Sequence, residues 1–154
     1  MFNIASHDQG WGGSREGAYD TSWTWFDVET IPSTQQESSE TDETTADSSE
    51  PQVRSFDHGV PGFLPTGDKL QANKAAVRET QQYTITWHHL DAIEPGTPEA
   101  EEIEREQGQG RATLDGRRVR EMGLGDSISV VGRARFGGWA NHVERLSVRV
   151  FWAV

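Results

Sequence analysis

Residues 22–28 read Ser-Trp-Thr-Trp-Phe-Asp-Val, and this run of aromatic and β-branched residues is the strongest strand signal in a chain of 154 residues. Side chains alternate between the two faces of a strand, so Trp23 and Trp25 share one face. Phe26 and Val28 share the opposite face. Because both faces are apolar, two interpretations stay open: the strand is central and buried on both sides, or one face is an aromatic platform at the surface.

Outward from this run, shorter segments show the period-two alternation of half-buried strands. These predicted strands span residues 2–5, 69–72, 83–87, 126–134 and 146–154. The side chains expected to face the core are Tyr83, Ile85, Trp87, Ile128, Val130, Ala134, Leu146, Val148, Val150, Trp152 and Val154. No convincing amphipathic helix interrupts the strands. The sequence therefore predicts an all-β fold, a single domain over residues 1–154 built as an antiparallel two-sheet β-sandwich or jelly roll.

Two acidic segments interrupt the strand pattern. Residues 30–53 hold six acidic residues and no basic one, and they offer almost nothing apolar to bury. We expect this segment to be a disordered insertion inside the domain, because burial cannot offset its ordering entropy. Residues 91–110 are predicted to be an acidic loop with a short helix. Thr97 as N-cap and Pro98 at the first helical position mark its start, and we expect at most two solvated turns up to Glu106.

The composition excludes several classes of protein. The chain has no cysteine, which excludes a disulfide scaffold, thiol catalysis and cysteine-ligated zinc. No apolar run approaches the ~20 residues of a membrane span, so no membrane partner is expected. Outside the two acidic segments the charge is nearly balanced, and a nucleic-acid partner is not expected either. The first residues lack the basic and apolar regions of a secretory signal, which together with the missing cysteines favours an intracellular, cytoplasmic location.

Several motifs occur in a fixed order along the chain. They are Ser6-His7-Asp8-Gln9-Gly10-Trp11, Ser22-Trp23-Thr24-Trp25-Phe26, Thr84-Ile85-Thr86-Trp87-His88, Gly125-Asp126-Ser127-Ile128, Arg133-Ala134-Arg135 and Gly138-Trp139. This order resembles an uncharacterised module of filamentous-fungal proteins, which occurs alone or attached to larger intracellular architectures. The resemblance implies a β-sandwich similar to galactose-binding-like or jelly-roll modules, and it implies no settled activity. The chain departs from the pattern at residues 136–139, Phe-Gly-Gly-Trp, where proline is expected before Gly-Trp. This departure concerns the rigidity of the turn and not the fold.

Two tryptophans flanked by glycines are the clearest candidates for a binding site. Trp11 lies in Gly-Trp-Gly-Gly and Trp139 in Gly-Gly-Trp-Ala-Asn-His, so each ring is able to face a ligand from a loop. Polar residues stand beside both. We therefore expect a ligand site where the segments 6–13 and 135–142 meet. Its candidate residues are His7, Asp8, Gln9, Trp11, Trp139, Asn141 and His142.

Several functions stay compatible with this set of residues. The preferred hypothesis is a non-enzymatic binding or interaction module whose partner is a protein or a glycan; its oligomeric state stays open. The first alternative is a carbohydrate-binding module in which Trp11 and Trp139 stack on sugar while Asp8 and Asn141 bind hydroxyls. The second alternative is a metal-assisted hydrolase that uses His7, Asp8 and His142. Structural roles compete with all of these: the tryptophans would plug the ends of the sandwich, and His7 and Asp8 would cap loop amides.

The remaining polar residues do not form a recognisable catalytic or metal-binding motif. His88 and His89 are adjacent on a predicted strand and are expected to point to opposite faces. No HExxH, GxSxG or phosphate-binding glycine loop is present. The basic cluster at residues 117–120 is expected to be a solvated turn. We therefore expect no catalytic residue, no bound metal and no cofactor.

Overall fold

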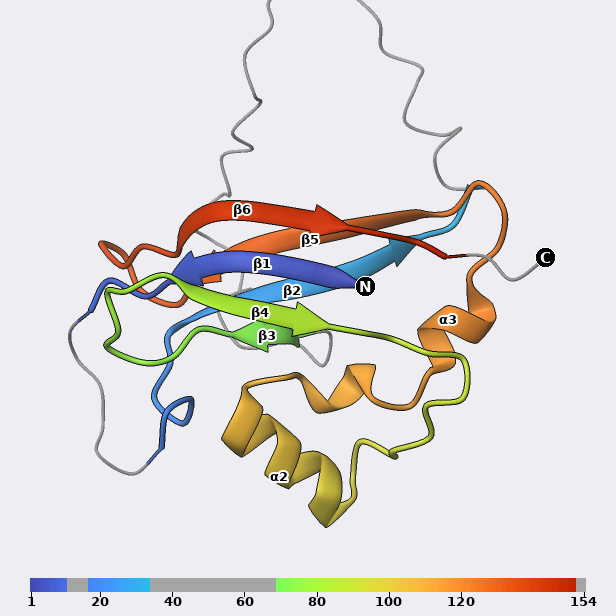
Figure 1. Ribbon diagram of the computed structural model, residues 1–154, viewed down its shortest axis with the longest axis horizontal. Coiled ribbons are helices and arrows are strands. Elements are labelled where there is room, and N and C mark those ends of the chain that lie inside the picture. The colour runs from blue at the N-terminus through green and yellow to red at the C-terminus, as the bar shows by residue number, and fades with distance from the viewer. Residues whose placement is uncertain (11–16, 34–68, 152–154) are drawn as a thin grey trace, which may run out of the picture.

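The computed structural model describes residues 1–10, 17–33 and 69–151 (Figure 1). Within them, the elements in chain order are β1 (Phe2–His7), β2 (Thr24–Ile31), β3 (Lys69–Ala72), β4 (Gln81–Ile85), α2 (Pro98–Gln107), the 3₁₀ turn η1 (Arg111–Thr113), α3 (Arg117–Glu121), β5 (Ser127–Ala134) and β6 (His142–Val148). Each of the six predicted strands corresponds to an observed one, and the all-β class is confirmed. In this part of the chain, no helix has the length and apolarity needed to span a membrane.

The strands form two antiparallel three-stranded sheets. One has the order β4-β1-β6 and the other has the order β3-β2-β5. Figure 1 shows the first sheet in front of the second, with α2 and α3 below and beside them. Side chains from both sheets belong to one hydrophobic core: Phe2, Ile4, Phe26, Val28, Leu70, Tyr83 and Ile85. Trp87, Ile128, Val130 and Val148 pack against this core, as the alternation predicted.

β2 lies at the centre of its sheet and is buried on both faces. Phe26 on one face is 1% exposed and Trp25 on the other is 3% exposed. The Trp25 indole Nε1 donates a hydrogen bond of 2.7 Å to Asp27 Oδ1, and Arg133 Nε donates one of 2.7 Å to Asp27 Oδ2. The central-strand interpretation is therefore confirmed for Trp25 and Phe26. Trp23, just before the strand, stays partly exposed.

The predicted acidic insertion, residues 30–53, overlaps the end of β2. β2 continues to Ile31, which pairs with Ser127 of β5, so residues 30 and 31 belong to the sheet and not to the insertion. The prediction was wrong at residues 30 and 31, because the start of the insertion was set by the composition of the segment, and composition does not reveal strand pairing. The stretch 34–53 lies outside the described residues, as do Trp11, Trp152 and Val154.

The last strand begins earlier and is more exposed than predicted. β6 starts at His142, and Leu146 lies opposite the buried Ile4. Leu146 nevertheless stays 36% exposed, because β6 is an edge strand and has a neighbour on one side only. Val150 follows the end of β6 and is 49% exposed. The expectation that Leu146 and Val150 are buried in the core is therefore wrong.

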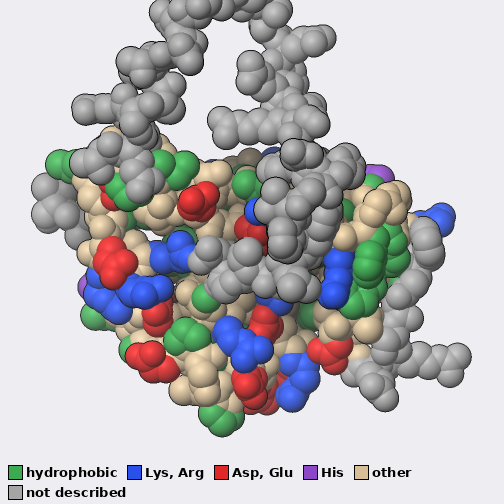
Figure 2. All heavy atoms as spheres, turned by 180° about the vertical axis from the view of Figure 1, so that it is seen from behind, with side chains coloured by type: hydrophobic (Ala, Val, Ile, Leu, Met, Phe, Trp, Pro, Cys, Tyr) green, Lys and Arg blue, Asp and Glu red, His purple; other side chains and the backbone are tan. Residues whose placement is uncertain are grey.

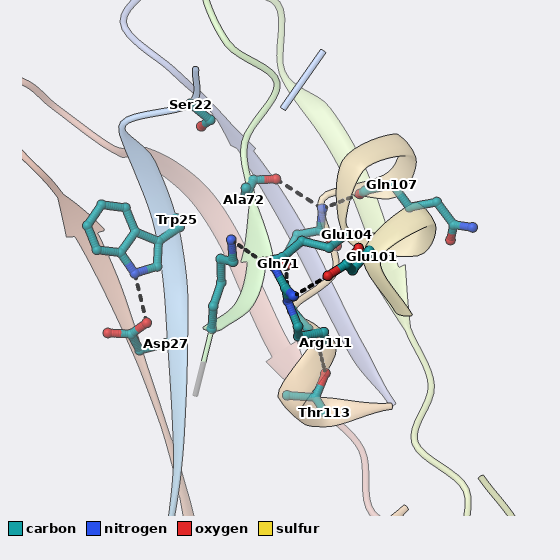
Figure 3. Close-up of polar contacts among 12 residues, drawn as sticks. Ser22, Trp25, Asp27, Gln71, Ala72, Glu101, Glu104, Gln107, Arg111 and Thr113 are labelled. Carbon is teal, nitrogen blue, oxygen red and sulfur yellow. Dashed lines mark hydrogen bonds and ion pairs between the residues drawn. The ribbon is translucent and has the colours of Figure 1, made fainter. Parts of the chain in front are cut away.

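The second acidic segment is not merely a solvated loop. The helix starts as predicted: Thr97 Oγ1 accepts a hydrogen bond from the Ala100 amide, and Gly108 with φ 74° ends it. α2 is longer than the two turns expected, and its Ala100 is fully buried. Gln71 of β3 donates from Nε2 to the Gln107 carbonyl at 2.7 Å, which attaches the helix to the sheet (Figure 3). The short helix predicted in this segment is therefore present, but it is longer than expected and is attached to the sheet.

Charged side chains complete the attachment of α2. Glu104 accepts from Lys69 Nζ at 2.5 Å and from Arg111 Nε at 2.6 Å. Seen from behind, acidic and basic side chains alternate over the lower part of the molecule (Figure 2). Burial by itself would raise the pKa of the Glu104 carboxyl, but Lys69 and Arg111 outweigh this effect and hold the pKa below its ordinary value.

We expect Glu104→Gln to lower the free energy of unfolding by about 1 kcal/mol at neutral pH. A carboxyl whose pKa is depressed by folding stabilises the protein above its ordinary pKa of 4.5, and this contribution disappears as the pH falls below that value. Urea unfolding curves should therefore separate the variant from the wild type at pH 7, and the curves should converge in acid. Glu102→Gln, at an exposed position of the same helix, is the control and should change little. A constant difference from pH 7 to pH 3 would contradict this role of Glu104.

The segment between β4 and β5 also differs from its prediction. Residues 117–120 form part of α3 and not a solvated turn, because the Arg120 guanidinium donates to the carbonyls of His89, Asp91 and Asp115. β4 ends at Ile85, so His88 and His89 follow the strand. Their ring centroids lie 4.3 Å apart, and the prediction that the two rings point to opposite faces is wrong.

Candidate functional site

The two segments that were expected to form a site lie against each other. His7, the last residue of β1, pairs with His142, the first residue of β6. Their rings are stacked, with centroids 4.6 Å apart and planes inclined by 9°. The Gln9 side-chain Oε1 accepts a hydrogen bond of 3.2 Å from the Ala140 amide. The end of the molecule at which β1 finishes and β6 begins is therefore the candidate site.

Asp8 points into the protein and not toward this surface. It is 1% exposed, and its two carboxylate oxygens accept from the Gln9 amide at 2.8 Å, the Ala76 amide at 3.0 Å and the Thr24 hydroxyl at 3.4 Å. Because successive strand residues face opposite sides, His7 on the outer face sends Asp8 inward. The described residues contain no group of three or more His, Asp or Glu side chains placed to hold a metal ion.

Asn141 and Asn73 belong to the same buried polar network. Asn73 is fully buried; it accepts from the Ser6 hydroxyl at 2.7 Å and donates to Thr24 Oγ1 at 3.0 Å and to Asn141 Oδ1 at 2.9 Å. Asn141 donates in turn to the Trp25 carbonyl at 2.9 Å. The network ties both sheets together below the site. Sequence reasoning missed Asn73, because a single asparagine after a weak strand carries no signal.

Four residues beside this end form an aromatic surface, which we name the β5–β6 patch: Trp23, Arg135, Phe136 and Trp139. The Phe136 ring lies 5.5 Å from the Trp23 ring and 5.8 Å from the Trp139 ring, measured between centroids. The Arg135 guanidinium stacks 4.6 Å above the Trp23 ring and 5.5 Å from the Phe136 ring. Phe136 is 46% exposed, whereas Trp23 and Trp139 are partly buried. Figure 2 shows hydrophobic side chains gathered at this end next to a basic side chain.

The turn between β5 and β6 holds the patch without a proline. The Trp139 amide donates to the Phe136 carbonyl at 3.1 Å, and Gly138 occupies the left-handed region with φ 84°. A residue with a Cβ would be strained there, so Gly138 is required by the turn. Sequence reasoning named Trp139 but missed Trp23, Arg135 and Phe136, because only the pairing of β2 with β5 brings Trp23 beside the turn.

A separate hollow of about 430 Å³ lies at the opposite end of the sheets. Its lining is mainly apolar and includes Trp87, Met122, Val148 and Phe151, together with His88 and His89. Phe151 is 74% exposed. Phe151 thus provides an exposed aromatic ring far from the β5–β6 patch, and its replacement is a control for the replacement of Phe136.

Comparisons with known proteins leave the site to be interpreted from its geometry. A scan against protein-family models finds no match to this chain. Searches of the curated proteins and of the solved structures find no match either. The resemblance to a fungal module stays a prediction.

Proposed function

We propose that the two sheets form a β-sandwich that acts as a non-enzymatic binding module, with the β5–β6 patch as its docking site. The partner that fits is a protein segment in which a carboxylate lies beside an apolar side chain. One observation carries the proposal: an exposed Phe136 ring stands between two partly buried tryptophan rings, and the Arg135 guanidinium lies against two of the three rings.

The aromatic rings supply the apolar part of such a site. Phe and Trp rings are enriched at the centres of protein interfaces, because they bury much area and lose little side-chain entropy on binding. Trp23 and Trp139 support Phe136 from two sides, so its ring is held in place before a partner arrives. A preorganised ring reduces the ordering cost of binding.

Arg135 supplies the charged part of the site. None of the carboxylates in residues 1–10, 17–33 and 69–151 forms an ion pair with the Arg135 guanidinium, which contacts the Trp23 and Phe136 rings. A guanidinium stacked on a ring keeps its N–H edge available for a bidentate carboxylate. Arg133, two residues earlier in the chain, is already bound to Asp27. Arg135 therefore favours an acidic partner.

The polar groups near the patch favour a protein over a glycan. Sugar recognition needs side chains that bind hydroxyl groups beside the stacking ring. Asp8 and Asn141, which were expected to do this, point inward and hydrogen-bond within the buried network. The inward direction of Asp8 also supports a non-enzymatic module, because it separates the carboxylate from the outer rings of His7 and His142.

The test uses short synthetic peptides that carry Glu beside Leu or Trp, and the same peptides with Gln in place of Glu. We expect the Glu peptides to shift the indole N–H resonances of Trp23 and Trp139 in NMR spectra, and the Gln peptides to bind more weakly. Equal binding of the two series would contradict the role of Arg135. Binding on a glycan array with no response to any peptide would overturn the choice of a protein partner.

Phe136→Ala should leave the melting temperature nearly unchanged and weaken binding of the Glu peptides at least 10-fold, because an aromatic anchor in an interface contributes about 2 kcal/mol. Phe151→Ala removes a ring that is more exposed (74% against 46% for Phe136) and lies far from the patch, so binding should stay unchanged. Trp139→Ala should weaken binding as well. It should also lower the melting temperature, because the Trp139 ring is partly buried. Equal binding by Phe136→Ala and wild type would exclude the patch as the site.

A further inference from the structure

The His7 and His142 rings form a cross-strand pair whose position is held by the sheet. β1 and β6 pair from Phe2–Val148 to His7–His142, with a bulge opposite Ala5 and Ser6. The two rings lie on the outer face, stacked 4.6 Å apart. His142 is exposed and His7 is partly buried. Two imidazoles on directly paired strand residues are close enough to reach one metal ion once one ring turns out of the stack.

The hydrogen bond of His7 sets its tautomer. Nδ1 of His7 lies 2.7 Å from the Asp8 carbonyl oxygen, and a carbonyl oxygen only accepts, so Nδ1 carries the proton. The lone pair of neutral His7 is therefore on Nε2. Histidines that bind metals usually donate the other ring N–H to a carbonyl or carboxylate in this way. The buried carboxylate of Asp8, bound by two amides, holds the backbone that supplies this carbonyl.

A second histidine pair among the described residues has the opposite arrangement. His88 and His89 also have adjacent rings, with centroids 4.3 Å apart. His88 Nδ1, however, accepts a hydrogen bond of 3.2 Å from the Leu90 amide, so the proton of the neutral ring is on Nε2. This pair is therefore a natural control. Its rings lie about as close together, but Nε2 of neutral His88 carries the proton and has no lone pair for a metal ion.

We infer that His7 and His142 together bind a divalent transition-metal ion, of the kind that imidazole ligands prefer: Cu²⁺, Ni²⁺ or Zn²⁺. For the two Nε2 atoms each to approach the ion to ~2.0–2.1 Å, the exposed His142 ring must turn out of the stack with His7. Glu144 lies on the same strand, but its carboxylate binds the Thr80 hydroxyl. The site thus offers two protein ligands, and water completes the coordination.

The inference is independent of the proposed function and has its own readouts. The full chain is titrated with Ni²⁺ by calorimetry, and Cu²⁺ is added to the NMR sample to locate the ion by broadening of the histidine ring resonances. Because the ion bridges β1 and β6 in the folded state only, Ni²⁺ should also raise the melting temperature in a concentration-dependent way. Broadening is expected at His7 and His142 before His88 and His89.

His142→Ala is the decisive variant, because the ring is exposed and its loss should leave the fold intact. We expect it to weaken Ni²⁺ binding at least ~10-fold and to abolish the metal-dependent rise in melting temperature. The control His89→Ala should bind Ni²⁺ like the wild type. Binding that survives in His142→Ala, broadening centred on His88 and His89, or no measurable Ni²⁺ binding would each overturn the inference. Peptide binding by the β5–β6 patch should not change in His142→Ala, which separates the two proposals.

Discussion

Replacing Asn73 by leucine is expected to lower the free energy of unfolding by about 3–5 kcal/mol, because the fully buried amide makes three hydrogen bonds. Leucine has the same branched shape as asparagine, although it is larger, and it leaves Ser6, Thr24 and Asn141 without these bonds in the interior. A buried polar group without a partner costs about 1–3 kcal/mol. The loss of three hydrogen bonds at once therefore accounts for the expected decrease in the free energy of unfolding. Chemical denaturation at pH 7 measures the difference.

The control for Asn73→Leu is Gln82→Leu, which makes a similar polar-to-apolar change at an exposed position of β4. This control should change the free energy of unfolding by less than about 0.5 kcal/mol. Ser6→Ala should give an intermediate result, since it removes one hydrogen bond of the network. Similar denaturation midpoints for Asn73→Leu and Gln82→Leu would show that the network contributes little to stability.

Gly110→Ala is expected to be nearly as destabilising, by about 3 kcal/mol, for a steric reason. A Cβ at Gly110 would lie 1.7 Å from the Lys69 carbonyl oxygen and 2.5 Å from the carbonyl carbon, both backbone atoms. The Gly110 amide also donates to the Leu70 carbonyl at 3.2 Å. The added methyl group therefore forces the start of η1 away from β3, and thermal denaturation should register the loss.

Gly137→Ala is the matched control for this substitution, because no heavy atom lies within 4 Å of the Cβ that it would add. It should leave the melting temperature unchanged. In Gly110→Ala, amide hydrogen exchange should accelerate in α2 and η1 before it does in β1 and β6, since the clash lies where these helices meet β3. A uniform acceleration over both sheets would contradict this local explanation.

The parts of the fold that could be predicted are those set by local sequence. β3 begins at Lys69 and ends at Ala72 as predicted, and β5 differs from its prediction by one residue. The start of α2 follows from the Thr97 cap alone. Burial could not be predicted in the same way. Leu146 alternates like a core residue, but its exposure depends on which strands are its neighbours, and that information is not local.

The candidate site could also be predicted only in part. Sequence motifs placed residues 6–13 and 135–142 at one site, and the structure brings Gln9 to Ala140. The direction of Asp8 could not be predicted, because the expected first strand ended at residue 5 and β1 continues to His7. Trp23 and Phe136 lie more than a hundred positions apart, so their contact follows from the pairing of β2 with β5 and has no counterpart in a sequence pattern.

The pairing of β1 with β6 has a consequence for how the protein folds. Phe2 pairs with Val148, so β1 completes its hydrogen bonds only after residues 142–148 of β6 have been made. Topologies dominated by such distant pairings fold on the millisecond-to-second timescale. At ~5–20 residues per second, synthesis leaves β1 without its β6 partner for roughly 7–30 seconds. During that interval β1 has an unpaired edge toward β6, and such an edge makes the nascent chain prone to aggregate.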